Sequence, residues 1–127
     1  MMNKDLNDLR YTMLEYLEGK GVPMQGRNRK FDPPEDKIWA RFATVGGEGS
    51  FGELGHKWIR QRGVVVIQLF APLNTGTADI DALAEDLKET FSGSTYGYLE
   101  LAAGSWNEVP TTTDFYHINV NLPYRHK

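Results

Sequence analysis

The sequence predicts one α+β domain, in which two amphipathic helices pack on a mostly antiparallel sheet of four or five strands. Three observations predict this fold. Residues 64–70 form an unbroken run of β-favouring side chains bounded by glycine and proline, which is typical of a strand buried on both faces or nearly so. Residues 77–91 then place apolar side chains at helical spacing. Residues 115–122 alternate apolar and polar side chains, which indicates a strand with one wet face. The expected order over residues 1–127 is α-β-β-β-α-β-β.

The composition is that of an ordinary globular domain. The chain has 127 residues, of which 40% are hydrophobic and 24% charged, enough to bury a core without disulfides. With no cysteine, a disulfide framework and thiolate metal sites are excluded, and a reducing compartment fits. The N-terminus carries no apolar signal core and no segment is long and apolar enough to cross a bilayer. We therefore expect no secretion by a signal peptide and no membrane partner.

The charges divide unevenly along the chain. Residues 1–63 hold 11 basic and 9 acidic side chains, whereas residues 64–127 hold 3 basic and 8 acidic ones. Halves of opposite sign could favour head-to-tail association between copies. Scattered surface charge is the simpler explanation of the same pattern.

The N-terminal segment is expected to form an amphipathic helix of about four turns that packs on the sheet. Asn3 or Asp5 can cap its start, and Gly19 and Gly21 end it. Its apolar stripe consists of Leu6, Leu9, Met13, Leu14 and Leu17.

The next segment is predicted to be irregular. Residues 22–25 contain a proline and are expected to be an edge strand or an extended linker. Arg27, Arg29 and Lys30 form a small basic cluster beside Phe31. Nucleic-acid sites usually combine a broader basic face with stacking rings, so we expect a solvated loop and no specific nucleic-acid partner.

Residues 38–45 are predicted to form a strand on which Trp39 either covers the second face of the sheet or meets a neighbouring subunit. The segment 46–55 contains five glycines and is expected to be a mobile hairpin loop that orders against a partner. Residues 57–62 then alternate apolar and polar side chains and lead into the central strand, with a bend expected at Gly63.

In the second half of the chain, Thr77 can cap the start of the second helix and Gly93 can close its end. A strand over residues 98–103, a loop that carries Trp106 and Pro110, and the strand over residues 115–122 follow. The tail, about residues 123–127, is expected to be frayed.

One local motif suggests phosphate binding but is incomplete. Residues 47–54 match the glycine-rich loop of protein kinases. The sequence contains no His-Arg-Asp loop and no Asp-Phe-Gly motif, and Glu48 and Glu53 would repel phosphate. We therefore expect no nucleotide at this loop.

Other catalytic or metal-binding patterns are also missing from the sequence. The three histidines have no metal-ligand spacing with one another or with carboxylates. His117 is expected to be solvated or hydrogen-bonded on the polar side of its strand. No Gly-x-Ser-x-Gly elbow occurs. The prediction is a protein without catalytic residues, metal ligands or cofactor, and therefore not an enzyme.

A series of structural features, in order, resembles one family. They are the first helix, Val22-Pro23, Arg27-Asn28 before Phe31, Pro33-Pro34, Trp39-Ala40-Arg41, the glycine-rich loop, residues 62–72, the turn at Gly76 and the second helix. Together they resemble the small phage proteins of the tail-terminator and tail-completion type, including a related phage and prophage domain of unknown function. The likeness runs from about Leu6 to Phe91 and is weaker afterwards. Gly26 departs from the family pattern, in which an acidic residue is common at that place.

The resemblance implies an α/β subunit that assembles into a ring, commonly of six, at the head-proximal end of a tail tube. Its partners would be other copies of itself, the tail-tube protein and head-connector proteins. It would be located in the virion tail or in the cytoplasm of the bacterial host. A ring subunit needs exposed apolar anchors, and the candidates for this role are Trp39, Phe51, Leu54, Trp58 and Trp106.

Two other classes of function stay open at this point. One is a small ligand-binding domain or enzyme whose site is built from loops, which would require polar groups converging on one pocket. The other is a monomeric adaptor that binds a single protein partner.

Overall fold

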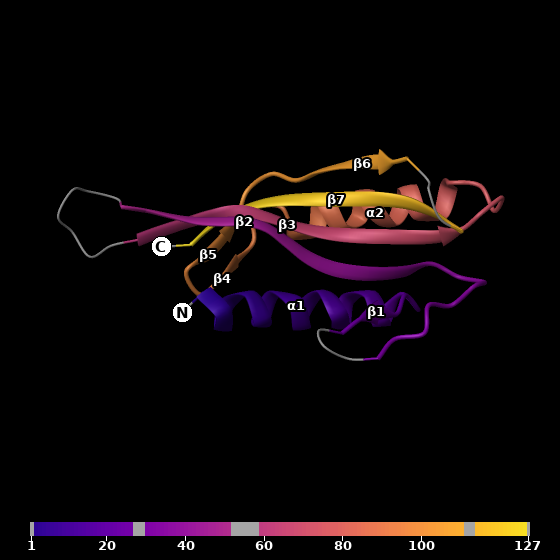
Figure 1. Cartoon of the computed structure of the whole chain (residues 1–127), viewed down its shortest axis with the longest axis horizontal. Coiled ribbons are helices and arrows are strands. Elements are labelled where there is room, and N and C mark those ends of the chain that lie inside the picture. The colour runs from indigo at the N-terminus through magenta and orange to yellow at the C-terminus, as the bar shows by residue number, and fades with distance from the viewer. Residues whose placement is uncertain (1, 27–29, 52–58, 111–113, 127) are drawn as a thin grey trace.

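In a computed structural model of the chain, residues 2–26, 30–51, 59–110 and 114–126 are described. Two helices and seven strands lie within these ranges (Figure 1). In chain order they are α1 (Met2–Gly19), β1 (Met24–Gln25), β2 (Trp39–Phe51), β3 (Ile59–Pro72), α2 (Ala78–Phe91), β4 (Thr95–Tyr96), β5 (Leu99–Leu101), β6 (Ser105–Val109) and β7 (Phe115–His126).

All the strands in the described part of the chain belong to one sheet with the order β1-β2-β3-β7-β5-β4, and β6 also pairs with β7. Strand β1 runs parallel to β2, while the other pairs are antiparallel. The α+β class is confirmed. The prediction of four or five mostly antiparallel strands is wrong in number and order, because the sheet is mixed and two short strands, β4 and β6, were not expected.

The long antiparallel pairs β2–β3 and β3–β7 form the centre of the sheet. Each residue of β3 from Gly63 to Phe70 has a partner on both sides. This places the apolar run of β3 in the middle of the domain, where both of its faces are covered: Val65, Ile67 and Leu69 are buried on one face, and Val66 and Phe70 on the other. The expectation of a strand buried on both faces is confirmed.

Both helices contribute to one core on one face of the sheet. Their buried stripes contact alternate residues of β3 and β7, because successive side chains of a strand point to opposite faces. The cluster includes Leu9, Met13 and Leu17 of α1, Ile80, Leu83, Leu87 and Phe91 of α2, Val65, Ile67 and Leu69 of β3, and Ile118, Val120 and Leu122 of β7. The opposite face of β2, β3 and β7 carries no helix, and we call it the open face.

One local prediction holds in part and two are wrong. Thr77 is the N-cap residue of α2, but its side chain makes no capping hydrogen bond, and its carbonyl accepts from the Asp81 amide at 2.9 Å. The predicted loop around Trp106 is strand β6. The tail is ordered, since β7 continues to His126 and buries Tyr124. Within the described residues, neither helix is both long and apolar enough to span a membrane.

Candidate assembly surfaces

An arm formed by β2 and β3 extends beyond the helices (Figure 1). It starts where Gly46 pairs with Gly63, next to a register shift between Gly46 and Glu48. Gly46 has a φ of 87°, which favours glycine. A Cβ at Gly63 would lie 2.7 Å from the Val45 carbonyl oxygen and 2.7 Å from the Tyr124 hydroxyl. The two glycines thus allow the strands to pass closely at the base of the arm.

The arm changes the prediction for residues 46–55. Its first part is strand and not loop, because β2 pairs with β3 up to Phe51 and Ile59. Leu54 and Trp58 lie outside the described residues, so their predicted role stays a prediction. Phe51 is the last described residue of β2, at the outer end of the arm.

On the open face, a row of rings crosses three strands. Trp39 of β2 stacks on Phe70 of β3 with 4.2 Å between ring centroids, and Phe70 stacks on His117 of β7 at 4.4 Å. Phe31 and Phe115 contact the Trp39 ring at 5.4 and 5.5 Å. Trp39 is 5% exposed, so it covers the second face of its own sheet. Whether it also contacts a neighbouring subunit stays a prediction.

Three polar atoms in this row and the next one lack partners. Trp39 Nε1, His117 Nε2 and Asn119 Oδ1 are buried without a hydrogen bond in the described structure, which is uncommon because such atoms cost free energy when left unpaired. The expectation of a solvated or hydrogen-bonded His117 holds in part, because the half-buried ring has a side-chain hydrogen bond with Asn119 while its Nε2 has no partner. Burial lowers the pKa of His117 below its usual value, Asn119 opposes this effect, and the charge of Arg41 adds to it.

The next row along the open face is rich in amides. The Arg41 guanidinium donates to Gln68 Oε1 at 2.5 Å, and Asn121 Nδ2 donates to Asn107 Oδ1 at 2.8 Å. Gln68 pairs with Asn119 across β3 and β7. The open face is therefore polar in its middle and aromatic at one end, and a face with these side chains can contact another protein surface.

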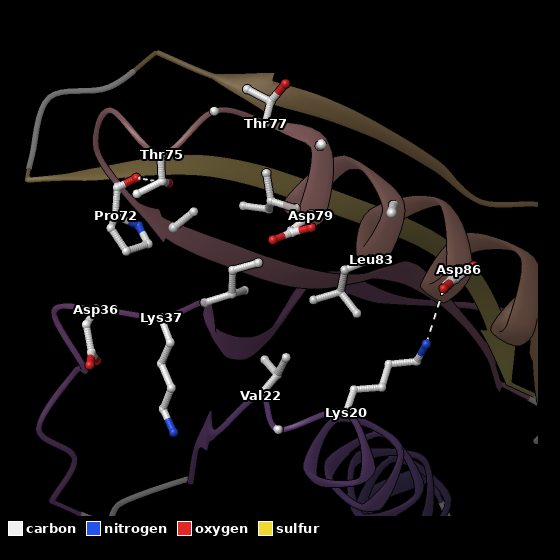
Figure 2. A pocket seen from close by; sticks show the side chains of 17 residues that line it. Lys20, Val22, Asp36, Lys37, Pro72, Thr75, Thr77, Asp79, Leu83 and Asp86 are labelled. Carbon is white, nitrogen blue, oxygen red and sulfur yellow. Dashed lines mark hydrogen bonds and ion pairs between the residues drawn. The ribbon is translucent and has the colours of Figure 1, made fainter.

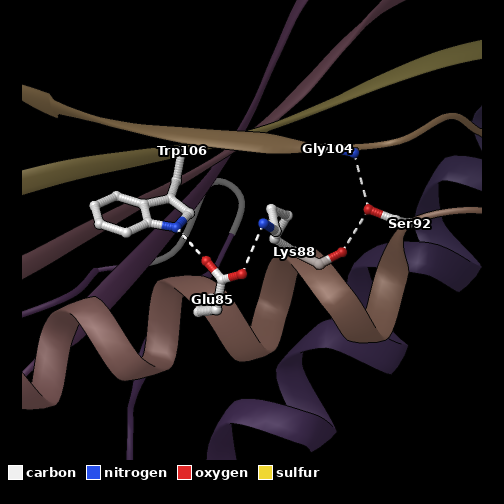
Figure 3. A network of polar contacts seen from close by, with 5 residues as sticks. All are labelled: Glu85, Lys88, Ser92, Gly104 and Trp106. Carbon is white, nitrogen blue, oxygen red and sulfur yellow. Dashed lines mark hydrogen bonds and ion pairs between the residues drawn. The ribbon is translucent and has the colours of Figure 1, made fainter.

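Trp106, the other aromatic candidate, fastens β6 to α2 (Figure 3). Its Nε1 donates to Glu85 Oε2 at 2.7 Å, and Lys88 pairs with the other oxygen at 2.7 Å. These two contacts, that of Lys88 first, lower the pKa of Glu85. Nearby, Ser92 Oγ accepts from the Gly104 amide at 2.8 Å. In the single chain, Trp106 is thus a half-buried packing residue, and a contact with a partner stays a prediction.

A groove of about 740 Å³ lies between the end of α1, the segment before β2 and the start of α2 (Figure 2). Lys20 and Asp86 form an ion pair of 3.2 Å across it. This contact raises the pKa of Lys20. Among the described residues, no group of three or more His, Asp or Glu side chains could hold a metal ion. The lining of the groove combines apolar side chains with the charged residues Lys20, Asp36, Lys37, Asp79 and Asp86.

The open-face row is a candidate that sequence patterns could not reveal. Trp39, Phe70 and His117 are far apart in the chain, and only the strand register brings them together. A partial signal exists, since each of them lies on the side of its strand opposite the core residues.

Comparison with known proteins gives a family. The chain matches the family described as phage tail terminator protein over residues 6–124. It is also similar to a solved structure of a protein without a descriptive name, with a TM-score of 0.60 and 20% sequence identity, covering 84% of this chain and 78% of that one. At this identity the likeness shows the fold alone. No curated protein matches the chain.

Proposed function

Because the chain belongs to the phage tail terminator family, we propose that it is a ring-forming subunit which caps the tail tube and joins it to the head. The family match carries this proposal. The partners would be other copies of the chain, the tail-tube protein and head-connector proteins. The protein would occur in the virion tail or, before assembly, in the host cytoplasm.

The arm formed by β2 and β3 supports an assembly role. Beyond Gln61, the outermost residue of β3 that pairs with β7, the described part of the arm consists of β2 and β3 only, and two-stranded hairpins are marginally stable alone. Such an element gains stability when it lies against another subunit or against the tube. Phe51, at the outer end of the arm, and Leu54 and Trp58, which follow it in the sequence, are the anchors that we propose for this contact.

We also propose that the protein is not an enzyme. The family is structural, and in the groove between α1 and α2 the side chains of Lys20 and Asp86 are paired with each other. Removal of metal ions and nucleotides from the solution should therefore leave ring formation and binding to tail tubes unchanged.

The proposal is tested with the purified chain and with tail tubes made of the tube protein from the same phage or prophage. Mass measurement over a range of concentrations should show a monomer or weak oligomer, and rings should form at high concentration or on tubes. In electron micrographs, tubes incubated with the protein should stop elongating and carry a cap at one end. Tubes that elongate unchanged, with no bound protein, would contradict the proposed function.

A further inference from the structure

Both sides of the sheet have strand edges without a partner strand among the described residues, and two of them, on β2 and β6, can meet. Strand β1 pairs with β2 only at Ala40 and Arg41, so within the described chain the outer edge of β2 from Phe42 to Phe51 has no partner strand. On the other side, β6 pairs with β7 along one edge, and its second edge has no partner strand among the described residues. Each free edge presents backbone N–H and C=O groups that a further strand could use.

From Phe42 to Val45, the edge of β2 lacks the features that usually prevent pairing with another strand. Soluble proteins usually protect such edges with charges, proline or bulges. The stretch from Phe42 to Val45 contains no charge and no proline, and its bulge lies only beyond Gly46. Val45 is an apolar, β-branched residue that is 61% exposed. These features are typical of an edge that accepts another strand.

The strand directions allow the two edges to meet. Strands β2 and β7 run one way, and β3 and β6 run the other way, because each of these neighbours is antiparallel. If two copies stand side by side in the same orientation, β6 of one copy is antiparallel to β2 of the next. Antiparallel pairing is the more stable kind, and repetition of this contact makes a head-to-tail series that closes into a ring if its rotation closes.

Charge favours the same arrangement. The β2 side of the sheet is built from the first half of the chain, which has 11 basic and 9 acidic residues. Lys37 and Arg41 are exposed there, next to the exposed acidic residues Asp32, Glu35 and Asp36. The β6 side is built from the second half, with 3 basic and 8 acidic residues, and Glu108 is exposed on β6. Sides of opposite sign attract in a head-to-tail contact and repel in a contact between two identical sides.

We propose that the copies of this chain join by strand pairing, in which β6 of one subunit adds to the free edge of β2 of the next. The inference rests on the proposed ring function and names the two surfaces that form its contact. Across the sheet, Trp106 of β6 lies in the same row as Phe42 of β2. Since β1 occupies Ala40 and Arg41, the incoming β6 shifts along β2 toward the arm, and such a stagger is what closure of a sheet requires.

The absence of cysteine from the chain allows a cross-linking test with no background. Val45→Cys is placed in one subunit population, and Ser105→Cys, Asn107→Cys or Val109→Cys in another. These three β6 residues share the open face with Val45. Opposite residues of antiparallel strands have Cα atoms about 4.5–5.5 Å apart, which is within the range for a disulfide.

The matched controls use the other face. Trp106 and Glu108 alternate with the three residues and point to the helix side, so Glu108→Cys mixed with Val45→Cys should react poorly. On tail tubes and under mild oxidation, we expect one of the three same-face mixtures to give on the order of tenfold more covalent dimer than the opposite-face control. The double variant with both cysteines of that pair should give a covalent ladder that ends at the ring size.

Other outcomes separate this inference from the proposed function. Equal yields from both faces, or self-cross-linking of Val45→Cys alone as the main product, would overturn the strand pairing between β2 and β6. Rings seen by mass on tubes without same-face cross-links would overturn it as well, while the proposed function would stand. Failure of the unmodified protein to bind tubes or to form rings would contradict both.

Discussion

Asp5, near the start of the first helix, lies with its Oδ2 2.7 Å from Nε2 of His126, in the last strand, and both side chains are buried. The same oxygen accepts from the Tyr98 amide at 3.1 Å. Gly97 leaves room for the carboxylate, since a Cβ there would lie 2.4 Å from Oδ1. A single carboxylate thus holds together α1, the turn between β4 and β5, and the end of β7.

The first prediction concerns the charge of Asp5. Its hydrogen bond with His126, together with the Tyr98 amide, lowers the pKa of Asp5 below the ordinary value of 3.8, although burial opposes the shift. A lowered carboxyl pKa contributes stability that is present above the unfolded pKa and is lost as the pH falls through the folded pKa. We expect Asp5→Asn to lower the urea midpoint at pH 7, and its difference from the unchanged protein to shrink below pH 3.8.

The control for this prediction is Asp8→Asn, one turn further along the same helix at an exposed position. This change should leave the urea midpoint at pH 7 unaltered. An equal loss of stability in both variants would mean that the contact between Asp5 and His126 is not what stabilises the two ends of the chain.

The second prediction concerns His117. Burial lowers its pKa below 6.5, so the folded state binds a proton less readily than the unfolded chain does. Stability should therefore fall as the pH drops from 6.5 toward the folded pKa. His117→Phe keeps a ring next to Phe70 and removes the titration. We expect its urea midpoint to change less between pH 7.5 and 5.5 than that of the unchanged protein. The same fall in both proteins would assign the effect to another group.

The third prediction separates the ring of Trp39 from its N–H group. Trp39→Ala removes a buried aromatic ring and should lower the free energy of unfolding by about 3–5 kcal/mol. Trp39→Phe keeps most of the ring and removes an Nε1 that has no partner, so it should cost less than about 1.5 kcal/mol. Urea unfolding of the isolated subunit measures both values. A large loss in Trp39→Phe would show that Nε1 does have a partner in solution.

The fourth prediction concerns the base of the arm. In Gly63→Ala the new methyl group would lie 2.7 Å from the Val45 carbonyl oxygen, and backbone cannot move away as a side-chain end can. We expect a loss of stability of about 1–3 kcal/mol, the range typical of overpacking. Gly19→Ala is the matched control, because no atom lies within 4 Å of its added Cβ. It should be neutral or stabilise by about 0.4–1 kcal/mol, as thermal unfolding can show.

The sequence pattern predicted the elements whose signal is long and periodic. Both helices and strand β7 were identified in this way, since their apolar residues recur at a spacing of 3.6 or 2, and β3 was identified from its unbroken run of β-favouring residues. Strand β6 was missed because the stretch from Ser105 to Val109 alternates without a clear apolar side. Its side chains are fixed by the contact of Trp106 with Glu85, which lies 21 residues away.

Tertiary contacts also decide the end of the chain and the open face. Pro123 and the charged residues after it predict a frayed tail, but the core contact of Tyr124 and the contact of His126 with Asp5 outweigh this local tendency. The row of Trp39, Phe70 and His117 depends on the register of three strands. The register between strands that are far apart in the chain cannot be inferred from a single sequence. For this reason the open face could not be predicted.

The last prediction concerns Phe51 at the outer end of the arm. A large aromatic side chain is the most effective anchor in an interface, and Phe51 is the last described residue of β2. We expect Phe51→Ala to change the free energy of unfolding by less than about 0.5 kcal/mol, and to weaken binding to tail tubes or ring formation about tenfold or more, as hot-spot residues do. Phe91→Ala is the contrasting variant, because Phe91 is buried in the core and its loss should cost about 3–5 kcal/mol. Binding is measured by co-sedimentation with tubes, and stability by urea unfolding. If Phe51→Ala unfolds the subunit as Phe91→Ala does, Phe51 belongs to the core and the arm needs another anchor.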